Sequence, residues 1–217
     1  IWTDEEFLGR KLYQRAPVQE LRKKGATLLI NISASPYHDG KEKIRQELLE
    51  KMVADVHLPS VMVNLVGGND DILFDGGSMA LNSQGKIIAR CKVFEEDLVM
   101  VNFKDMTGDI RDWPTRSEAW RAEALILGIR NYVRKSGFKR VLVGLSGGID
   151  SSLVALLAAS ALGPKQVTGV AMPSPFTSPA SQEDAASLAQ KLGIEFLMLP
   201  IEPLMRAYDQ ALKNVFV

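Results

Sequence analysis

The sequence predicts an α/β fold, and two observations carry that prediction. From residue 117 onward, short apolar runs alternate with amphipathic segments, so that a strand is followed by a helix three times in succession. Such alternation is typical of a parallel, doubly wound sheet. Before residue 104 the chain also begins as α/β, but it then changes to short strands separated by turn residues, which indicates hairpins. We therefore expect two α/β parts in one chain.

The first part, residues 1–103, starts with a short helix over residues 17–24. Residues 27–32 form a continuous apolar run, the pattern of a strand that is covered on both faces. A loop of small residues follows. Residues 41–56 then repeat apolar side chains at four-residue spacing, which predicts a helix.

A second strand is expected over residues 61–66, and we expect Gly67-Gly68 to end it. Asn82-Ser83-Gln84-Gly85 is typical of a hairpin turn. Further short strands are predicted around residues 72–74, 78–81, 87–93 and 98–103. Residues 104–116 are the predicted linker, because they hold Gly108, Pro114 and alternating charges with little apolar content.

The second part, residues 117–217, begins with a helix that Ser117 caps and Gly137 ends. The strand–helix units follow it. Ser181-Gln182-Glu183-Asp184 resembles a capping box and predicts the start of the middle helix, and Pro203 suits the first turn of the last one. The predicted strands are residues 141–145, 167–172 and 194–199, and the first crossover helix is residues 151–162.

Composition limits the function classes. Apolar residues make up 46% of the chain, and Lys+Arg and Asp+Glu both total 26, so nothing indicates a nucleic-acid or membrane partner. The single cysteine, Cys91, suits a reducing cytoplasm. The chain starts without methionine and ends inside an apolar-periodic stretch. We therefore expect an internal fragment of a longer protein, with little activity of its own.

One stretch carries the chemistry. A strand runs into two glycines and a helix starts at once, which lets the backbone approach an anion without side-chain clash. The free N–H groups of a helix start point toward such a ligand. Serine hydroxyls can add donors, and the carboxylate beside them calls for Mg²⁺ between it and a polyphosphate. The stretch reads Val141-Leu142-Val143-Gly144-Leu145-Ser146-Gly147-Gly148-Ile149-Asp150-Ser151-Ser152.

The alternative is an ordinary strand-to-helix turn, since glycine and serine are common there. The six residues from Ser146 to Ser151 nevertheless resemble the SGGxDS pyrophosphate loop of the N-type ATP pyrophosphatases, whose domain is adenine nucleotide α-hydrolase-like. That resemblance implies ATP and Mg²⁺ as cofactors, with Asp150 as a metal ligand. It implies ATP binding by Gly144, Ser146, Gly147, Gly148, Ile149, Asp150, Ser151, Ser152 and Met172.

Within those enzymes the chain resembles the glutamine-dependent NAD synthetases. Met172-Pro173-Ser174, followed by Phe176-Thr177-Ser178, is similar to that family's segment at the adenine and over the substrates. Three stretches of the first part are similar to its nitrilase-type glutaminase domain. The resemblance implies that this part is the C-terminal portion of a nitrilase-like α/β sandwich. The stretches are Asn31-Ile32-Ser33-Ala34-Ser35-Pro36, Phe74-Asp75-Gly76-Gly77-Ser78 and Phe94-Glu95-Glu96-Asp97-Leu98.

The family's glutaminase uses a Glu, Lys and Cys triad, with the Cys in a C-E-D-[IL]-W segment. Because this chain opens with Ile1-Trp2, we expect it to begin just past that Cys and assign it no catalytic residue. The resemblance implies that Ser35 and Lys41 contact glutamine. The alternatives are a turn serine before Pro36 and a solvated charge at a helix start.

Other candidates have a structural interpretation. Arg90 and Lys92 could lower the pKa of Cys91, but we favour a structural cysteine. His38 and His57 are expected at the surface, and Trp113 and Trp120 are expected to pack. Asp70-Asp71 and Glu95-Glu96-Asp97 are expected to be solvated turn charges rather than metal ligands.

The resemblance implies amidation of deamido-NAD to NAD through an acyl adenylate, with ammonia from glutamine. The implied partners are deamido-NAD, ATP and glutamine, in a cytoplasmic homo-oligomer. Two alternatives stay open at this point. One is another ATP pyrophosphatase, similar to GMP synthetase or to a tRNA-modifying enzyme, and the other is a non-catalytic nucleotide-binding module.

Overall fold

The computed structural model describes residues 16–213, so the expectations that concern Ile1-Trp2 and the last residues lie outside the described residues. The chain divides into two compact units, Ile1–Ala124 and Leu125–Val217. Helix α4 (Ser117–Lys135) carries the division. Each unit is described by itself.

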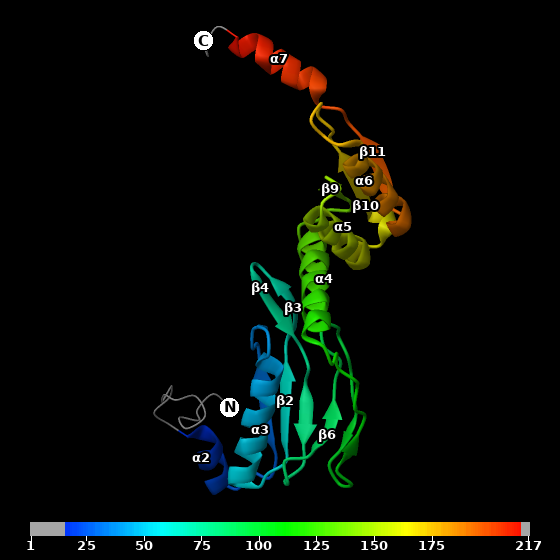
Figure 1. Cartoon of the computed structure of the whole chain (residues 1–217). Coiled ribbons are helices and arrows are strands. Elements are labelled where there is room, and N and C mark those ends of the chain that lie inside the picture. Colours follow the sequence, from blue (N-terminus) through cyan, green and yellow to red (C-terminus); the bar gives the residue numbers. More distant parts are fainter. Residues whose placement is uncertain (1–15, 214–217) are drawn as a thin grey trace. The chain divides into compact units, whose positions relative to one another are not determined.

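The first unit holds a four-stranded sheet in the order β1-β2-β5-β6. β1 and β2 are parallel, whereas β5 pairs antiparallel with β2 and with β6. Two small hairpins, β3–β4 and β7–β8, complete the unit (Figure 1). The elements are α2 (Pro17–Lys23), β1 (Leu29–Ser33), α3 (Lys41–Val56), β2 (Ser60–Asn64), β3 (Val66–Asn69), β4 (Ile72–Asp75), β5 (Met79–Leu81), β6 (Ile87–Arg90), β7 (Val101–Asn102) and β8 (Thr107–Gly108).

Helix α3 covers one face of this sheet and has the predicted bounds. Its side chains Leu49 and Val53 form a core with Met62, Met79 and Leu81 of the strands, and all five are at most 2% exposed. On the opposite face, residues 99–106 cover the β5–β6 side, where Ala80, Ile88 and Ala89 are buried. Burial on both faces thus holds the β5–β6 half of the sheet in place.

The expectation that residues 27–32 form a strand covered on both faces is wrong for the described part of the chain. β1 alternates between buried and exposed positions, and Ile30 and Ile32 are 64% and 83% exposed. The reason is that, among the described residues, only the α3 side of β1 and β2 has a covering layer. Val63 of β2 lies beside Ile32 and is also exposed.

The expectation that Gly67-Gly68 ends a strand is also wrong. Both glycines lie inside β3, where they pair with Phe74 and Leu73 of β4. The main-chain pairing of a hairpin does not depend on side chains, so glycine weakens such a strand without ending it. The last two predicted strands are shorter than expected, since β6 ends at Arg90 and β7 is only Val101–Asn102.

Residues 104–116, the predicted linker, pack onto the first unit. Thr107 and Gly108 form β8, which pairs with β7. The Trp113 indole N–H donates to the Cys91 carbonyl at 2.8 Å, and the Arg90 guanidinium stacks on the Trp113 ring. The division into residues 1–103, a linker at residues 104–116 and residues 117–217 stays a prediction.

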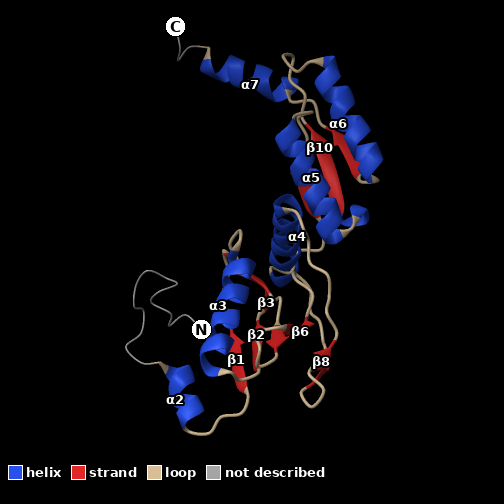
Figure 2. Cartoon of the chain, turned by 60° about the horizontal axis from the view of Figure 1, so that its bottom comes forward, coloured by secondary structure: helices blue, strands red, loops and turns tan. Residues whose placement is uncertain are grey.

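The second unit confirms the predicted alternation of strands and helices. Its three strands are all parallel, in the order β11-β10-β9 (Figure 2). One core joins the sheet to α5 and α6, and it includes Val143, Ala155, Val167 and Ala189. The two crossover helices therefore share one face of the sheet. The elements are β9 (Val141–Gly144), α5 (Ile149–Leu162), β10 (Val167–Ala171), α6 (Pro179–Leu192), β11 (Glu195–Met198) and α7 (Glu202–Leu212), with a 3₁₀ turn at Pro164–Gln166.

The predicted capping box at Ser181 is wrong. Helix α6 starts earlier, at Pro179, and its N-cap is Ser178, whose hydroxyl accepts a hydrogen bond from the Ser181 N–H at 3.1 Å. Ser178-Pro179 satisfies two rules at once, because serine is a good N-cap and proline fits the first helical position. The N-cap therefore lies three residues before the predicted one.

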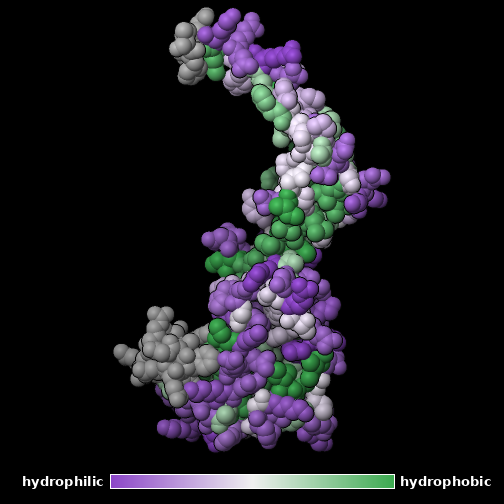
Figure 3. All heavy atoms as spheres, in the orientation of Figure 1, coloured by the Kyte–Doolittle hydropathy of each residue, from purple (hydrophilic) through white to green (hydrophobic). Residues whose placement is uncertain are grey.

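Apolar side chains also lie on the outer side of α5. Ile149, Leu153 and Leu156 follow one another at helical spacing and are 81%, 51% and 46% exposed. Figure 3 shows this part of the second unit as hydrophobic surface. Among the described residues, no helix has the length and apolar character needed to cross a bilayer.

A buried ion pair joins α3 to β4 in the first unit. The Arg45 guanidinium donates to both carboxylate oxygens of Asp75, at 2.8 Å for Nη1 to Oδ1, and both residues are 0% exposed. Removing one partner of such a pair leaves the other charge buried and uncompensated.

We predict that Asp75→Ala lowers the free energy of unfolding of the first unit by about 3–5 kcal/mol. Urea unfolding followed by tryptophan fluorescence measures this, because all three tryptophans belong to that unit. Glu95→Ala is the control, since it breaks an exposed pair with Lys92 and should change the midpoint little. Equal midpoints for the two variants would show that the buried pair does not stabilise the unit.

Candidate functional site

The sharp turn between β9 and α5 is the centre of the candidate site. It runs from Leu145 to Gly148, and Gly147 has a φ of +79°. A side chain on Gly147 would also meet the main chain of Ser181, because its Cβ would lie 2.3 Å from that carbonyl oxygen. Backbone conformation and close approach therefore both require glycine at this position.

Three serine hydroxyls hold the turn in shape. Those of Ser151 and Ser152 donate to the Gly148 carbonyl at 3.1 and 2.8 Å. The Ser146 hydroxyl accepts from the Gly148 N–H at 3.2 Å and contacts the Ser151 hydroxyl at 3.1 Å. These hydroxyls, which we expected to donate to a ligand, are thus engaged within the turn.

The N–H groups of the first helical turn are free. Within the described residues, those of Gly147, Ile149, Asp150 and Ser151 have no hydrogen-bond partner. The cap of α5 is Gly148, which offers no side chain to satisfy them. Free N–H groups and the positive end of the helix dipole favour an anion here.

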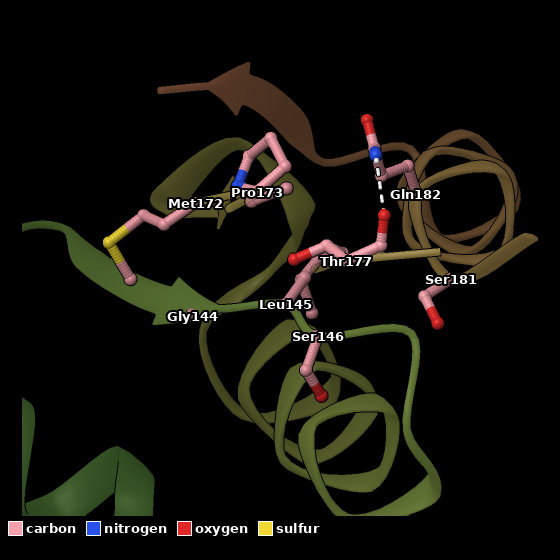
Figure 4. A pocket seen from close by; sticks show the side chains of 9 residues that line it. Gly144, Leu145, Ser146, Met172, Pro173, Thr177, Ser181 and Gln182 are labelled. Carbon is pink, nitrogen blue, oxygen red and sulfur yellow. Dashed lines mark hydrogen bonds between the residues drawn. The ribbon is translucent and has the colours of Figure 1, made fainter. Parts of the chain in front are cut away.

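A cavity of about 360 Å³ opens beside this turn. It lies at the carboxyl ends of β9 and β10, where parallel sheets bind their ligands. Figure 4 shows the side chains of Ser146, Met172, Thr177 and Gln182 around it, with the Gln182 amide donating to the Thr177 carbonyl. The lining is Gly144, Leu145, Ser146, Ala171, Met172, Pro173, Thr177, Ser181 and Gln182.

The predicted nucleotide residues thus fall into two groups. Gly144, Ser146 and Met172 line the cavity. Those from Gly147 to Ser152 form the turn and the first turn of α5. Pro173 and Thr177 belong to the segment that the resemblance placed over the substrates, whereas sequence reasoning missed Leu145, Ala171, Ser181 and Gln182 as lining residues. Their position just after two apolar strands was the signal that could have found them.

Asp150 stands in the first turn of α5 with an exposed carboxylate. That carboxylate has no ion pair or hydrogen bond with other described residues, so it is free to bind a ligand. No group of three or more His, Cys, Asp or Glu in residues 16–213 could hold a metal ion. One carboxylate does fit Mg²⁺, however, because this ion is commonly bound by one or two carboxylates together with substrate phosphates and water.

The first unit holds the two predicted glutamine residues. Ser35 follows β1 and is 7% exposed, and its hydroxyl has no hydrogen-bond partner. Lys41 is the first residue of α3, and burial lowers its pKa, with Arg45 adding to that effect. Hydrogen bonds of Asn64 connect Ser35 to Asp75 of the buried Arg45–Asp75 pair. The charges of Arg45 and Asp75 both act on the pKa of Lys41.

Two family models match the chain, and they match successive parts of it. Residues 10–112 match carbon-nitrogen hydrolases and residues 121–216 match NAD synthases. Two curated relatives are glutamine-dependent NAD(+) synthetases: that of Synechocystis sp. is 45% identical over 100% of this chain, and that of Thermotoga maritima is 39% identical over 88%. Over almost all of its length the chain is thus similar to the glutamine-dependent NAD(+) synthetase family.

The solved structures agree with this family. The glutamine-dependent NAD+ synthetase of Acinetobacter baumannii, determined in complex with ADP, has 34% identity and a TM-score of 0.84 over 92% of this chain. That of Cytophaga hutchinsonii, at 23% identity and a TM-score of 0.75 over 89% of this chain, shows the same fold. The predicted fold class, a nitrilase-like part followed by a synthetase part with a parallel sheet, is confirmed.

The chain spans about 40% of the length of these curated relatives, and 39% of each of the two solved chains. Its own residues are therefore the ones whose roles can be argued from this structure.

The remaining candidates behave as structural or surface residues. Burial raises the pKa of the Cys91 thiol, with Asp97 adding to that effect, so its flanking cations do not activate it. His38 and His57 are exposed, as are Asp70 and Asp71. Trp113 and Trp120 pack edge to face at 5.7 Å, as expected, although both also line a cavity of about 640 Å³.

We predict that Gly147→Ala disrupts the turn between β9 and α5, because the new Cβ would overlap the Ser181 carbonyl at a φ that alanine rarely adopts. Hydrogen exchange of peptides from residues 141–198 should show lost protection at the start of α5 and α6. Gly193→Ala is the matched control, because it also has positive φ but only Pro164 Cβ nearby, at 4.0 Å. It should cost about 1–2 kcal/mol from its backbone conformation alone.

If the two alanine variants lose equal protection, the contact with Ser181 is not what requires glycine at position 147.

Proposed function

We propose that the natural protein containing this chain carries out the ATP-dependent amidation of deamido-NAD to NAD, with ammonia that is released from glutamine. The observation that carries the proposal is the β9–α5 turn. It presents four free N–H groups beside a cavity, in a chain that matches both NAD synthases and carbon-nitrogen hydrolases.

The nucleotide lies with its phosphates on the turn and its adenine toward Met172. Gly147 and the first turn of α5 supply the free N–H groups of Gly147, Ile149, Asp150 and Ser151 to the phosphate oxygens, and Ser146, Gly148 and Ser152 hold the turn in shape. Gly144 leaves room at the end of β9, and the exposed Met172 side chain lies beside it, with Cε 3.8 Å from where a Gly144 Cβ would be. The A. baumannii relative was determined with ADP, which supports an adenine nucleotide as the ligand.

Asp150 is the proposed ligand of Mg²⁺, which would neutralise phosphate charge when bound. The first helical turn holds no other acidic residue, and no Lys or Arg among the described residues forms an ion pair with Asp150. The site is therefore completed by the nucleotide, since phosphate oxygens and water supply the remaining ligands that Mg²⁺ prefers.

The turn supports the reaction by positioning and by charge stabilisation. In the first step a carboxylate oxygen of deamido-NAD bonds to the α-phosphorus of ATP, and the bond to the β-phosphate breaks. The free N–H groups of Gly147 and Ile149 stabilise the negative charge on the departing pyrophosphate. In the second step ammonia forms the amide bond and AMP leaves. Neither step uses a nucleophilic side chain of the chain.

The first unit supplies the ammonia. Ser35 and Lys41 contact glutamine, Ser35 through its unpartnered hydroxyl and Lys41 through its ammonium, which can pair with the glutamine carboxylate. In this proposal the protein binds deamido-NAD, ATP and glutamine, and it has no nucleic-acid or membrane partner. It acts as a homo-oligomer in the cytoplasm. The domains are residues 1–103 and 117–217.

We predict that the natural protein containing this sequence releases pyrophosphate from ATP only when deamido-NAD is supplied. An enzyme-coupled pyrophosphate assay with deamido-NAD, XMP or tRNA tests this, with ammonia or glutamine as the nitrogen source. Turnover with XMP or tRNA would instead assign another ATP pyrophosphatase. ATP binding without turnover on any substrate would assign a binding module.

We predict that Asp150→Asn lowers kcat/KM for ATP by at least about 100-fold, since charge stabilisation of this kind contributes about that much. It should also raise the Mg²⁺ concentration that gives half-maximal rate. Asp209→Asn on α7 is the control, because it removes an equally exposed carboxylate from the same unit. An Asp150→Asn protein with the Mg²⁺ dependence of the control would remove Asp150 from the metal site.

A further inference from the structure

The buried polar atoms that lack a partner are concentrated in one stretch of the chain. Within the described residues there are four such side-chain atoms, and all belong to residues 35–45. Native proteins leave few buried polar groups unpaired, so a cluster of them indicates a place that a polar ligand completes. The atoms are Ser35 Oγ, Tyr37 OH, Glu42 Oε2 and Arg45 Nε.

Asn64, at the end of β2, fixes the main chain next to this cluster. Its Oδ1 accepts the Ser35 N–H at 2.8 Å, and its Nδ2 lies 3.4 Å from the Ser35 carbonyl oxygen. The same Nδ2 donates to the Gly76 carbonyl at 3.0 Å. One amide therefore holds both the N–H and the C=O of Ser35, and it ties the loop after β1 to the loop after β4.

The Asn64 amide is itself held from the far side. Its Nδ2 lies 3.4 Å from Asp75 Oδ1, and the Asp75 carboxylate is bound by the Arg45 guanidinium. The Asn64 main-chain N–H donates to the Ser78 hydroxyl at 3.0 Å. Asn64 is 6% exposed, so these contacts are made away from water, where each one counts for more.

We propose that Asn64 is a positioning residue for glutamine, which acts by holding Ser35 so that its hydroxyl faces the substrate. The inference rests on the proposed function, because it takes glutamine as the ligand of Ser35. Asn64 has a hydrogen-bond partner on each of its polar atoms, so it has none left for the substrate. Ser35 is the opposite case, with its main chain fixed by Asn64 and its hydroxyl unpaired.

This arrangement explains why Ser35 can bind although it lies in a loop. A small displacement of a contacting group is enough to lose most of its effect, and loops move more easily than strands. Asn64 is the last residue of β2, a central strand of the sheet, so its side chain ties the loop to a rigid element.

The test compares nitrogen sources in the natural full-length protein that contains these residues. With Asn64→Ala, KM for glutamine should rise about 10-fold, while kcat with saturating glutamine falls less. NAD formation driven by ammonium chloride should stay as in the wild type, because it bypasses the glutamine site. Asn69→Ala is the matched control, since Asn69 is exposed in the β3–β4 hairpin and contacts only Asp70 through its side chain.

A double variant shows whether Asn64 acts through Ser35. Ser35→Ala removes the proposed substrate contact, and it should raise KM for glutamine by itself. If Asn64 serves only to place that hydroxyl, Ser35→Ala/Asn64→Ala should have the KM of the worse single variant. Multiplied effects would mean that Asn64 acts independently of Ser35, and the proposal would be wrong.

Asn64→Ser keeps the test valid if the alanine variant does not fold. Serine leaves a hydroxyl in place of the amide and adds no charge beside the buried Asp75 carboxylate, so a smaller rise in KM is expected. An unchanged KM in a folded Asn64 variant overturns the inference. Absence of NAD formation by the wild type with either nitrogen source overturns the proposed function instead.

Discussion

The close approach of two main-chain segments determines the candidate nucleotide site. The turn at Gly147 lies so near the first turn of α6 that a Cβ at this position would sit 2.3 Å from the Ser181 carbonyl oxygen. This contact brings the starts of α5 and α6 together at the carboxyl ends of β9 and β10. The cavity lies between these segments, so its shape depends on a residue without a side chain.

In the first unit, polar side chains rather than main-chain contacts hold the loops of the site in place. The Arg45–Asp75 pair is costly to bury, and a well-packed apolar pair could stabilise the unit as much. The pair matters because it orients neighbouring polar groups. Asp75 also contacts Asn64, and the Asn64 side chain bonds to the loops after β1 and β4. A hydrogen-bonded network specifies one arrangement of these loops, which apolar contacts would not do.

Local patterns predicted those features that local forces decide. The strands at residues 141–144 and 167–171, the helix at residues 41–56 and the turn at Gly147-Gly148 are found where their residues placed them. The errors arose where distant contacts decide. Ile30 and Ile32 carry the apolar pattern of a strand covered on both faces, yet β1 lies at an edge whose outer face no described segment covers. Competing caps three residues apart, Ser178 and Ser181, cannot be ranked without seeing which hydroxyl accepts the N–H.

The candidate site divides in the same way. Its glycine turn could be found from sequence, because a strand, two glycines and a helix start are consecutive in the chain. The residues that complete the cavity, such as Thr177 and Gln182, come from the loop after the next strand and from the start of α6, and only folding brings them to it. Asn64 is harder still, since its partners Ser35 and Asp75 are 29 and 11 residues away and nothing in its sequence neighbourhood marks it.

The serine hydroxyls of the turn explain how the site can bind without first being reorganised. Ser151 and Ser152 both donate to the Gly148 carbonyl, and Ser146 accepts from the Gly148 N–H, so the turn is fixed by its own residues. What remains unpaired is the row of N–H groups from Gly147 to Ser151, apart from that of Gly148. An anion that reaches these groups replaces only water. The ordering of the backbone is complete before binding, and that makes the stabilisation of developing phosphate charge effective.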